Sequence, residues 1–281
     1  MLSSAFSSER RTFVSGYWKL PGNAKRSVDY YGRHFSQLLS VMREQHLIFY
    51  SDDEQILDDM ASRAAESRVS LDARHLPVMQ LPAFEQSESL AKSCSLMVLD
   101  QWSRPSRTAG EKGVNHYWRD LKGSGLETYR QLLCVWLSKV PLMSSLASQM
   151  PSDHGLSWVD LTIMRFSHQR SNWRFWRVSD RPGCLSHYAS PMRYMGQPLP
   201  INASYLSASA QVWLLVNEIF QGSASLASAM PYGHDEETIL GECQRQNPEL
   251  FHCIGAPYSR LSKRAAIRAR VIDCLSGWYE S

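Results

Sequence analysis

Short apolar runs alternate with a helical stripe in the N-terminal part of the chain, and this alternation constrains the fold more than any other feature of the sequence. RTFVSGYW (11–18), HLIFY (46–50) and HLPVMQLP (75–82) are runs of the length of a β-strand, the first centred on residues 12–16. Apolar residues recur at helical spacing over 28–43, and a polar helix is expected after the second run. Strands that alternate with helices predict an α/β fold with a mostly parallel central sheet and helices on both faces.

The remainder of the chain continues this pattern. Helical periodicity marks residues 85–101 and 127–147, and an apolar segment predicts a strand at 156–160. AQVWLLVNEIFQGS (210–223) is apolar enough to predict one or two further strands. HDEETILGECQRQ (234–246) predicts a helix whose acidic first turn suits the helix dipole.

We expect one domain over residues 1–281, because a chain of this length with 43% hydrophobic residues can bury a single large core. Residues 103–126 are polar and rich in glycine, which predicts an irregular insertion or a mobile loop. Residues 258–278 are basic with an apolar stripe, which predicts a C-terminal helix. We expect that helix to dock on the domain, and the alternative is peripheral contact with the inner membrane through its basic residues.

Composition and missing motifs exclude several classes of protein. A net charge of +3 is too small to indicate a nucleic-acid partner. MLSSAFSSERR lacks the apolar core of a signal peptide, and none of the six cysteines forms a CxxC pair, so we expect a cytoplasmic protein with reduced thiols. The absence of the GxGxxG, Walker A, HExxH and GxSxG patterns argues against dinucleotide oxidoreductases, P-loop NTPases, zincins and α/β-hydrolases.

Asp160 is the acid that most needs an explanation, because it interrupts the apolar segment LSWVDLTIMRF. A buried carboxylate without a partner is costly, so it usually has either a partner or a function. In the first interpretation Asp160 bonds a buried arginine or caps the next turn. In the second it lies at the carboxyl end of a central strand, where open α/β sheets bind ligands, and holds a divalent ion that bridges two phosphates.

Other charged residues also have two interpretations. Asp52, in SDD after the second strand, either bonds a ribose or base or caps the following helix, and composition favours the cap. Arg26 and Lys139 are candidate phosphate contacts, although a lysine in an apolar stretch more often extends to the surface. HDEE (234–237) supplies either a general base or a solvated helix start, and its spacing favours the helix start.

Four groups of short stretches, in this order along the chain, resemble the HtrL/YibB-type proteins of bacterial polysaccharide gene clusters. They are FVSGYW with RSVDYY, LIFYSDD, VWLSKVPLM with LSWVDLTIMRF, and IFQGSASL with DEETIL and PELF. The resemblance spans most of residues 11–255. It implies a GT-A-like fold, that of the nucleotide-diphospho-sugar transferases, and a glycosyltransferase activity.

The resemblance also implies roles for individual residues around a nucleotide-sugar donor. A divalent ion, Mn²⁺ or Mg²⁺, would bridge the diphosphate, and Asp160 would hold that ion or the sugar. The other implied roles are a nucleotide pocket lined by Ser15, Gly16 and Tyr17, a base or ribose contact from Asp52, diphosphate contacts from Arg26 or Lys139, and an acceptor contact from Asp235 or Glu236.

The acceptor implied by the resemblance is a glycan or lipid-linked glycan of a surface polysaccharide or lipopolysaccharide. The alternative is a non-catalytic member that keeps the fold and binds carbohydrate or protein. Two differences from the family favour this alternative. Leu161 and Thr162 follow Asp160 where the family usually has a small residue and glycine, and the chain has no Asp-x-Asp triplet.

Overall fold

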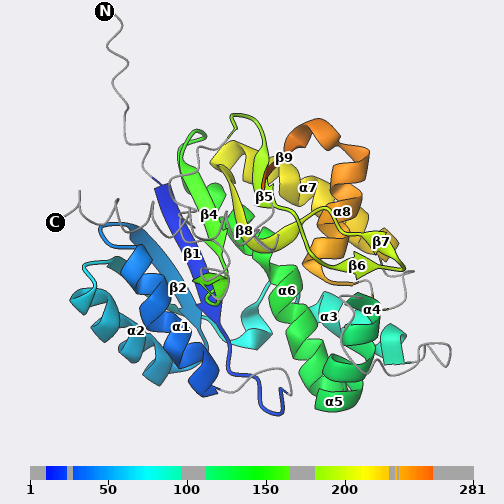
Figure 1. Ribbon diagram of the computed structural model, residues 1–281, viewed down its shortest axis with the longest axis horizontal. Coiled ribbons are helices and arrows are strands. Elements are labelled where there is room, and N and C mark those ends of the chain that lie inside the picture. Colours follow the sequence, from blue (N-terminus) through cyan, green and yellow to red (C-terminus); the bar gives the residue numbers. More distant parts are fainter. Residues whose placement is uncertain are drawn as a thin grey trace, which may run out of the picture.

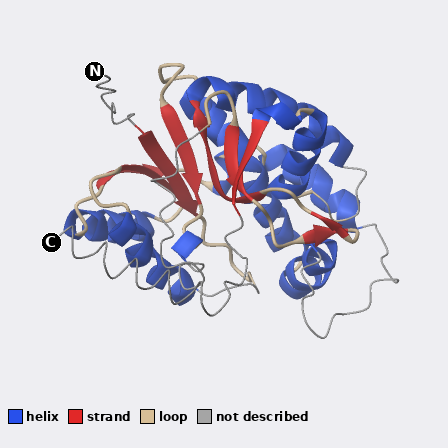
Figure 2. Cartoon of the chain, turned by 45° about the horizontal axis from the view of Figure 1, so that its top comes forward, coloured by secondary structure: helices blue, strands red, loops and turns tan. Residues whose placement is uncertain are grey.

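A seven-stranded sheet with helices packed on both faces forms the centre of the protein (Figures 1 and 2). The computed structural model describes residues 11–23, 28–95, 112–164, 181–227, 232 and 234–255. Among these residues the strands of the large sheet are β1(Arg11–Tyr17), β2(His46–Ser51), β3(Ser70–His75), β4(Gly155–Val159), β5(Leu185–Tyr188), β8(Asn202–Ser209) and β9(Phe251–Gly255). A separate two-stranded hairpin joins β6(Arg193–Tyr194) to β7(Gln197–Pro198).

The sheet is mostly parallel, in the order β3-β2-β1-β4-β8-β5-β9. Strands β1 to β4 run parallel to their neighbours among these four, whereas β8 is antiparallel to both β4 and β5. The chain extends from β1 outward to β3 and then returns to the other side of β1 as β4. The carboxyl ends of β1 and β4 therefore lie where the strand order reverses, which is where open α/β sheets bind ligands.

The helices divide between the two faces of the sheet because successive residues of a strand point to opposite faces. Phe13 packs with α1(Val28–Val41) and α2(Glu54–Glu66) on one face, whereas Val14 belongs to the core of the other face. That second face is covered by α3(Phe84–Ser95), α6(Leu126–Ala147), α7(Ala210–Ala227) and α8(Glu236–Gln246) (Figure 1). No helix in the described ranges has both the length and the hydropathy needed to cross a membrane.

Short helical segments complete the structure. The 3₁₀ turns are η1(Val78–Gln80) and η5(Pro248–Leu250). Between α3 and α6 the chain forms α4(Lys112–Asn115), the π-helical segment η2(His116–Leu121) and α5(Lys122–Ser124) in direct succession. The beginning of α6 thus follows a continuous helical stretch.

Most of the regular elements predicted from the sequence are confirmed. The strands expected at 12–16 and 46–50 are β1 and β2, and the strand expected at 156–160 is β4, which ends one residue before Asp160. Helices are present in the regions expected at 28–43, 127–147 and 234–246. The mostly parallel sheet with helices on both faces is likewise present.

Three predictions about local structure are wrong. The third strand is β3 at residues 70–75 rather than 75–82, because Pro77 cannot donate to a sheet and the chain turns at η1. Residues 210–223 belong to helix α7, since Trp213, Val216 and Phe220 are buried at helical spacing while Leu214 and Leu215 are exposed. The preceding strand is β8.

The irregular loop expected at 103–126 is the third error. Residues 112–124 are helical, and four of their polar side chains, Lys112, Asn115, His116 and Arg119, line a cavity. The first part of that prediction lies outside the described residues, as do the end of the helix expected at 85–101 and the whole of the helix expected at 258–278.

Gly16, at the end of β1, is close to the ring of Trp18. A Cβ at Gly16 would lie 2.6 Å from two carbons of that ring, whose Nε1 donates a hydrogen bond to the carbonyl oxygen of Leu76 at 2.8 Å. We predict that Gly16→Ala lowers the free energy of unfolding by about 1–3 kcal/mol, because the buried ring must move. Urea denaturation measures the change. Gly155→Ala is the control, since its Cβ would meet only Arg11 at 3.7 Å, and equal losses in the two variants would contradict the prediction.

Candidate functional site

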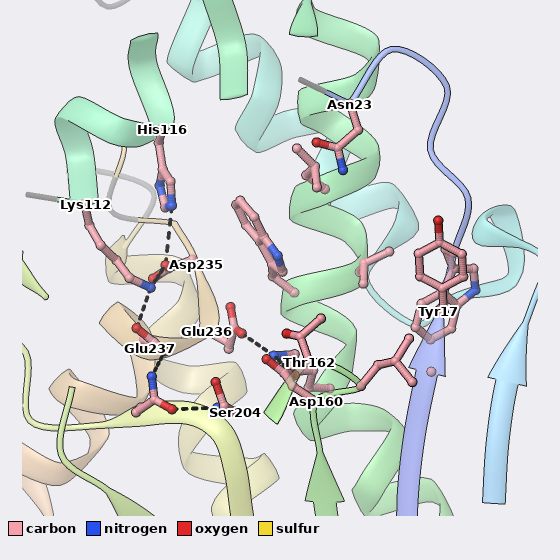
Figure 3. Close-up of a pocket in the computed structure, with 18 of the residues that line it drawn as sticks. Tyr17, Asn23, Lys112, His116, Asp160, Thr162, Ser204, Asp235, Glu236 and Glu237 are labelled. Carbon is pink, nitrogen blue, oxygen red and sulfur yellow. Dashed lines mark hydrogen bonds and ion pairs between the residues drawn. The ribbon is translucent and has the colours of Figure 1, made fainter. Parts of the chain in front are cut away.

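A cavity of about 360 Å³ opens at the carboxyl ends of β1 and β4 (Figure 3). Its walls come from the end of β1, the segment α4–η2, the middle of α6, the residues after β4 and the first turn of α8. Charged side chains from these elements point toward one another across the cavity (Figure 3). They form two clusters, each built around one buried lysine.

The first cluster answers the question raised by Asp160. Lys139 of α6 places its Nζ 2.8 Å from Asp160 Oδ1 and 2.7 Å from Glu236 Oε1. The indole Nε1 of Trp158 also donates to Asp160 Oδ1, at 2.9 Å. Asp160 therefore has a buried cation as partner, a lysine rather than an arginine, and its side chain still lines the cavity with 25% exposure. The expectation that Lys139 extends to the surface is wrong, since its side chain is only 6% exposed.

The second cluster joins α4 to α8. Lys112 Nζ forms ion pairs with Asp235 Oδ2 and, at 2.6 Å, with Glu237 Oε2. Asp235 also caps α8, because its Oδ1 accepts hydrogen bonds from the backbone N–H of Thr238 at 2.9 Å and from its hydroxyl at 2.8 Å. Glu237 Oε1 accepts hydrogen bonds from Asn202 Nδ2 and from the backbone N–H of Ala203, both at 3.0 Å. Both acids are thus engaged by the protein itself.

His116 borders this second cluster from η2. Its ring stacks on Trp136 with centroids 5.1 Å apart, and its Nδ1 lies 3.0 Å from the carbonyl oxygen of Tyr232. The other ring nitrogen, Nε2, lies 3.5 Å from Asp235 Oδ2. Burial lowers the pKa of His116, although the nearby Asp235 opposes that shift, so the imidazole is neutral near pH 7.

Two neighbouring acids at the start of α8, Asp235 and Glu236, have pKa values shifted in opposite directions. Burial raises the pKa of Glu236 to about 7, because the opposing effect of Lys139 is partly cancelled by the negative charges of Asp235 and Glu237. Burial alone would also raise the pKa of Asp235, but the adjacent Lys112 ammonium holds it well below its usual range. Neighbouring carboxyl groups whose pKa values are pushed apart are typical of acid–base sites.

The structure brings together six of the residues singled out from the sequence. Gly16, Tyr17, Lys139, Asp160, Asp235 and Glu236 all line the cavity. Ser15 is buried inside β1, and its Oγ has no hydrogen-bond partner within the described part of the chain. Arg26 lies outside the described residues.

Asp52 lies apart from this cavity, beside a shallower depression at the end of β2. Its Oδ1 accepts a hydrogen bond from the backbone N–H of Lys19 at 3.3 Å. The helix cap that we favoured for Asp52 is instead supplied by Asp53, which accepts hydrogen bonds from the backbone N–H groups of Gln55 and Ile56.

Several residues that line the cavity were not singled out from the sequence. Lys112, Asn115, His116 and Arg119 follow the spacing i, i+3, i+4, i+7, which places them on one face of a helix. The helical spacing of these polar residues was the signal in the sequence that could have indicated a helix. The nearby glycines favoured a loop instead. Glu237 was also missed as an individual residue because HDEE was considered only as a helix start or a general base.

The carboxylates of the cavity do not fit a divalent ion in this arrangement. Each of the four acids, namely Asp160, Asp235, Glu236 and Glu237, has a lysine ammonium group within ion-pair distance. A divalent ion at Asp160 would have to displace Lys139 and leave that ammonium group buried, which is costly. Within the described ranges no three His, Cys, Asp or Glu side chains gather as a metal site would require.

Comparisons with known proteins do not supply a relative for this site. A scan against models of protein families gives no match, and a search of curated proteins gives none either. The resemblance to the HtrL/YibB-type proteins therefore stays a prediction from the short stretches that carry it.

The central position of Lys139 leads to a stability prediction. Lys139→Met would leave both Asp160 and Glu236 without their buried cation, so we expect a loss of about 3–5 kcal/mol in the free energy of unfolding. Asp160→Asn should cost clearly less, because Lys139 keeps Glu236 as its partner. Urea denaturation of both variants at pH 7 measures the difference. Equal losses would show that Lys139 supports the fold through Asp160 alone, and a more stable Lys139→Met protein would show that the ion pairs do not support the fold.

The raised pKa of Glu236 leads to a prediction about pH. Glu236 titrates near 7 in the folded chain and near 4.5 when unfolded, so the folded state binds more protons between these values. The contribution of Glu236 to the stability of the wild type therefore falls as pH rises from 5 to 8, whereas Glu236→Gln lacks this change. We expect the stability of Glu236→Gln relative to wild type to increase by about 2–3 kcal/mol over that interval.

Glu242→Gln provides the matched control for this titration. Glu242 lies on the same helix outside the cavity, and its hydrogen bond from Arg245 lowers its pKa, so it stays ionised throughout pH 5–8. Denaturation series at pH 5, 6, 7 and 8 should show a constant difference between Glu242→Gln and wild type. A constant difference for Glu236→Gln as well would mean that Glu236 has an ordinary pKa.

Proposed function

We propose that the protein is a glycosyltransferase of GT-A-like fold, which transfers a sugar from a nucleotide-sugar donor to a glycan or lipid-linked glycan acceptor. One observation carries the proposal. Three of the four groups of stretches that resemble the HtrL/YibB-type proteins contribute side chains to the same cavity, among them Tyr17, Lys139, Asp160 and Glu236. That cavity lies where the strand order of the sheet reverses, which is the usual ligand site of such sheets.

In this proposal the aromatic and polar walls bind the two parts of the donor. Tyr17 and Tyr31 both line the cavity with their ring centroids 4.6 Å apart, and they provide a surface on which a nucleobase can stack. Trp136 provides an apolar face for a sugar ring. Asp160 and Ser204 supply polar groups in the same cavity for sugar hydroxyls.

Glu236 is the residue that we assign to the acceptor. In the reaction the acceptor oxygen bonds to the anomeric carbon, the bond from that carbon to the diphosphate breaks, and the acceptor hydroxyl loses its proton. A carboxyl group with a pKa of about 7 is well suited to accept this proton near neutral pH. Asp235 is less suited, because two hydrogen bonds from Thr238 and the ion pair with Lys112 hold it ionised.

A non-catalytic carbohydrate-binding protein is the second candidate. The observation in its favour is that each of the four acids of the cavity has a lysine ammonium group as its partner, which leaves the donor set unsuited to a divalent ion. Such a protein would bind a glycan in the same cavity without releasing a nucleotide. Thermal shift with nucleotide sugars and with free glycans separates the two candidates, because a ligand of the native state raises the melting temperature.

Glu236→Gln tests the proposed role of the acid in catalysis. We predict that it lowers kcat by about 10²–10⁴-fold, because the acceptor proton loses its base, while donor binding is retained. The measurement is nucleotide release from UDP-, GDP-, dTDP- and CMP-sugars with glycan acceptors, with and without Mn²⁺. Glu242→Gln, on the exposed side of α8, should keep wild-type turnover. Full turnover by Glu236→Gln would show that Glu236 is not the base. Absence of donor binding by the wild type would refute the proposal that the protein is a glycosyltransferase.

A further inference from the structure

Among the described residues, three cationic side chains line the cavity, and they differ in how many carboxylates surround them. Lys139 and Lys112 each lie between two carboxylates, and their side chains are 6% and 11% exposed. The positive charge of each ammonium group is already balanced by its carboxylates, so neither is suited to bind an anionic ligand. Arg119, the third of these cations, pairs with a single carboxylate in the described part of the chain, that of Asp120, and its side chain is 31% exposed.

The guanidinium of Arg119 is held along one edge. Its Nε lies 2.6 Å from Asp120 Oδ1 and its Nη2 lies 2.7 Å from Asp120 Oδ2, so the two groups form a two-pronged pair. Asp120 is completely buried, which prevents the pair from moving freely. Within the described residues Asp120 accepts all of the hydrogen bonds that Arg119 donates. The N–H groups on the Nη1 side of the guanidinium are therefore available to a ligand.

The position of Arg119 on η2 directs it to the cavity. It shares one helical face with Lys112, Asn115 and His116, and all four side chains line the cavity. The segment is π-helical, a conformation that occurs often at functional sites. Lys112 anchors this segment to α8 through its ion pairs with Asp235 and Glu237, and His116 anchors it to α6 by stacking on Trp136 (Figure 3).

We propose that Arg119, positioned by Asp120, is the anion-binding residue of the cavity and that its ligand is the diphosphate of the donor. The planar guanidinium can donate two parallel hydrogen bonds to a phosphate, which a lysine cannot do. The identity of the ligand as a nucleoside diphosphate rests on the proposed function. The same donors would also suit the carboxylate of an acidic sugar, so the test includes both kinds of anion.

Calorimetric titration of the full chain with inorganic pyrophosphate, UDP, GDP and glucuronate tests this assignment, in EDTA and again with Mn²⁺. The variants are Arg119→Met and Arg119→Lys, and the second keeps a positive charge beside Asp120 if the first fails to fold. Arg245→Met is the matched control, because Arg245 bonds Glu242 through the same Nε and Nη2 edge but is exposed on α8 outside the cavity.

We expect pyrophosphate and at least one nucleoside diphosphate to bind the wild type in EDTA. Both Arg119 variants should weaken this binding at least tenfold, whereas Arg245→Met should leave it unchanged. Pyrophosphate binding that depends on Arg119, together with no binding of UDP or GDP, would support the anion site and refute the nucleotide-sugar donor.

Four results would overturn the assignment of Arg119. The first is wild-type affinity for pyrophosphate in a folded Arg119→Lys protein, and the second is absence of pyrophosphate binding by the wild type under both conditions. The third is tight binding of glucuronate without pyrophosphate, which would make the site specific for carboxylates. UDP or GDP binding that survives in the Arg119 variants would overturn the assignment while the proposed function stands.

Discussion

The Lys139 ammonium group lies at the junction of three elements, and the arrangement of the cavity depends on it. A buried ammonium group is stable only when carboxylates or carbonyl oxygens surround it. Lys139 meets this requirement with Asp160 after β4, Glu236 on α8 and, at 3.4 Å, the carbonyl oxygen of Ala203 in β8. The lysine therefore links α6 to α8 and to the carboxyl edge of the sheet.

The same ion pairs that join these elements also set the chemistry of the cavity. Two lysines among four carboxylates leave the acids with an excess of negative charge, and burial makes that excess unfavourable. The excess is concentrated on Glu236, which holds a proton more tightly than an ordinary glutamate does, whereas Lys112 keeps Asp235 ionised. The groups that link these elements are thus also the groups whose pKa values are shifted, so a substitution of either lysine changes both the ion pairs and the protonation of the acids.

The sequence predicted the structure correctly where a periodic apolar pattern, or a single charge within an apolar segment, indicated which residues are buried. The strands β1, β2 and β4 and the position of Asp160 at a carboxyl edge followed from such patterns. The partner of Asp160 could not be predicted, because Lys139 is 21 residues away and only the packing of α6 brings it near. Helix α7 was mistaken for strands because its apolar residues are nearly continuous in the sequence, and only the tertiary structure shows which face is buried.

The first turn of α8 places three acids in direct succession, and each has a different set of contacts. Glu236 binds Lys139 of α6, while Asp235 and Glu237 flank Lys112 of α4. Successive residues of a helix are rotated by about 100° around its axis. The three acids can therefore reach their lysines in only one alignment of the sequence with the helix. An insertion or deletion of a single residue within it would turn the acids away from both lysines at once. In a lineage of such proteins, changes of length should therefore be tolerated in the surface loops and absent from this turn.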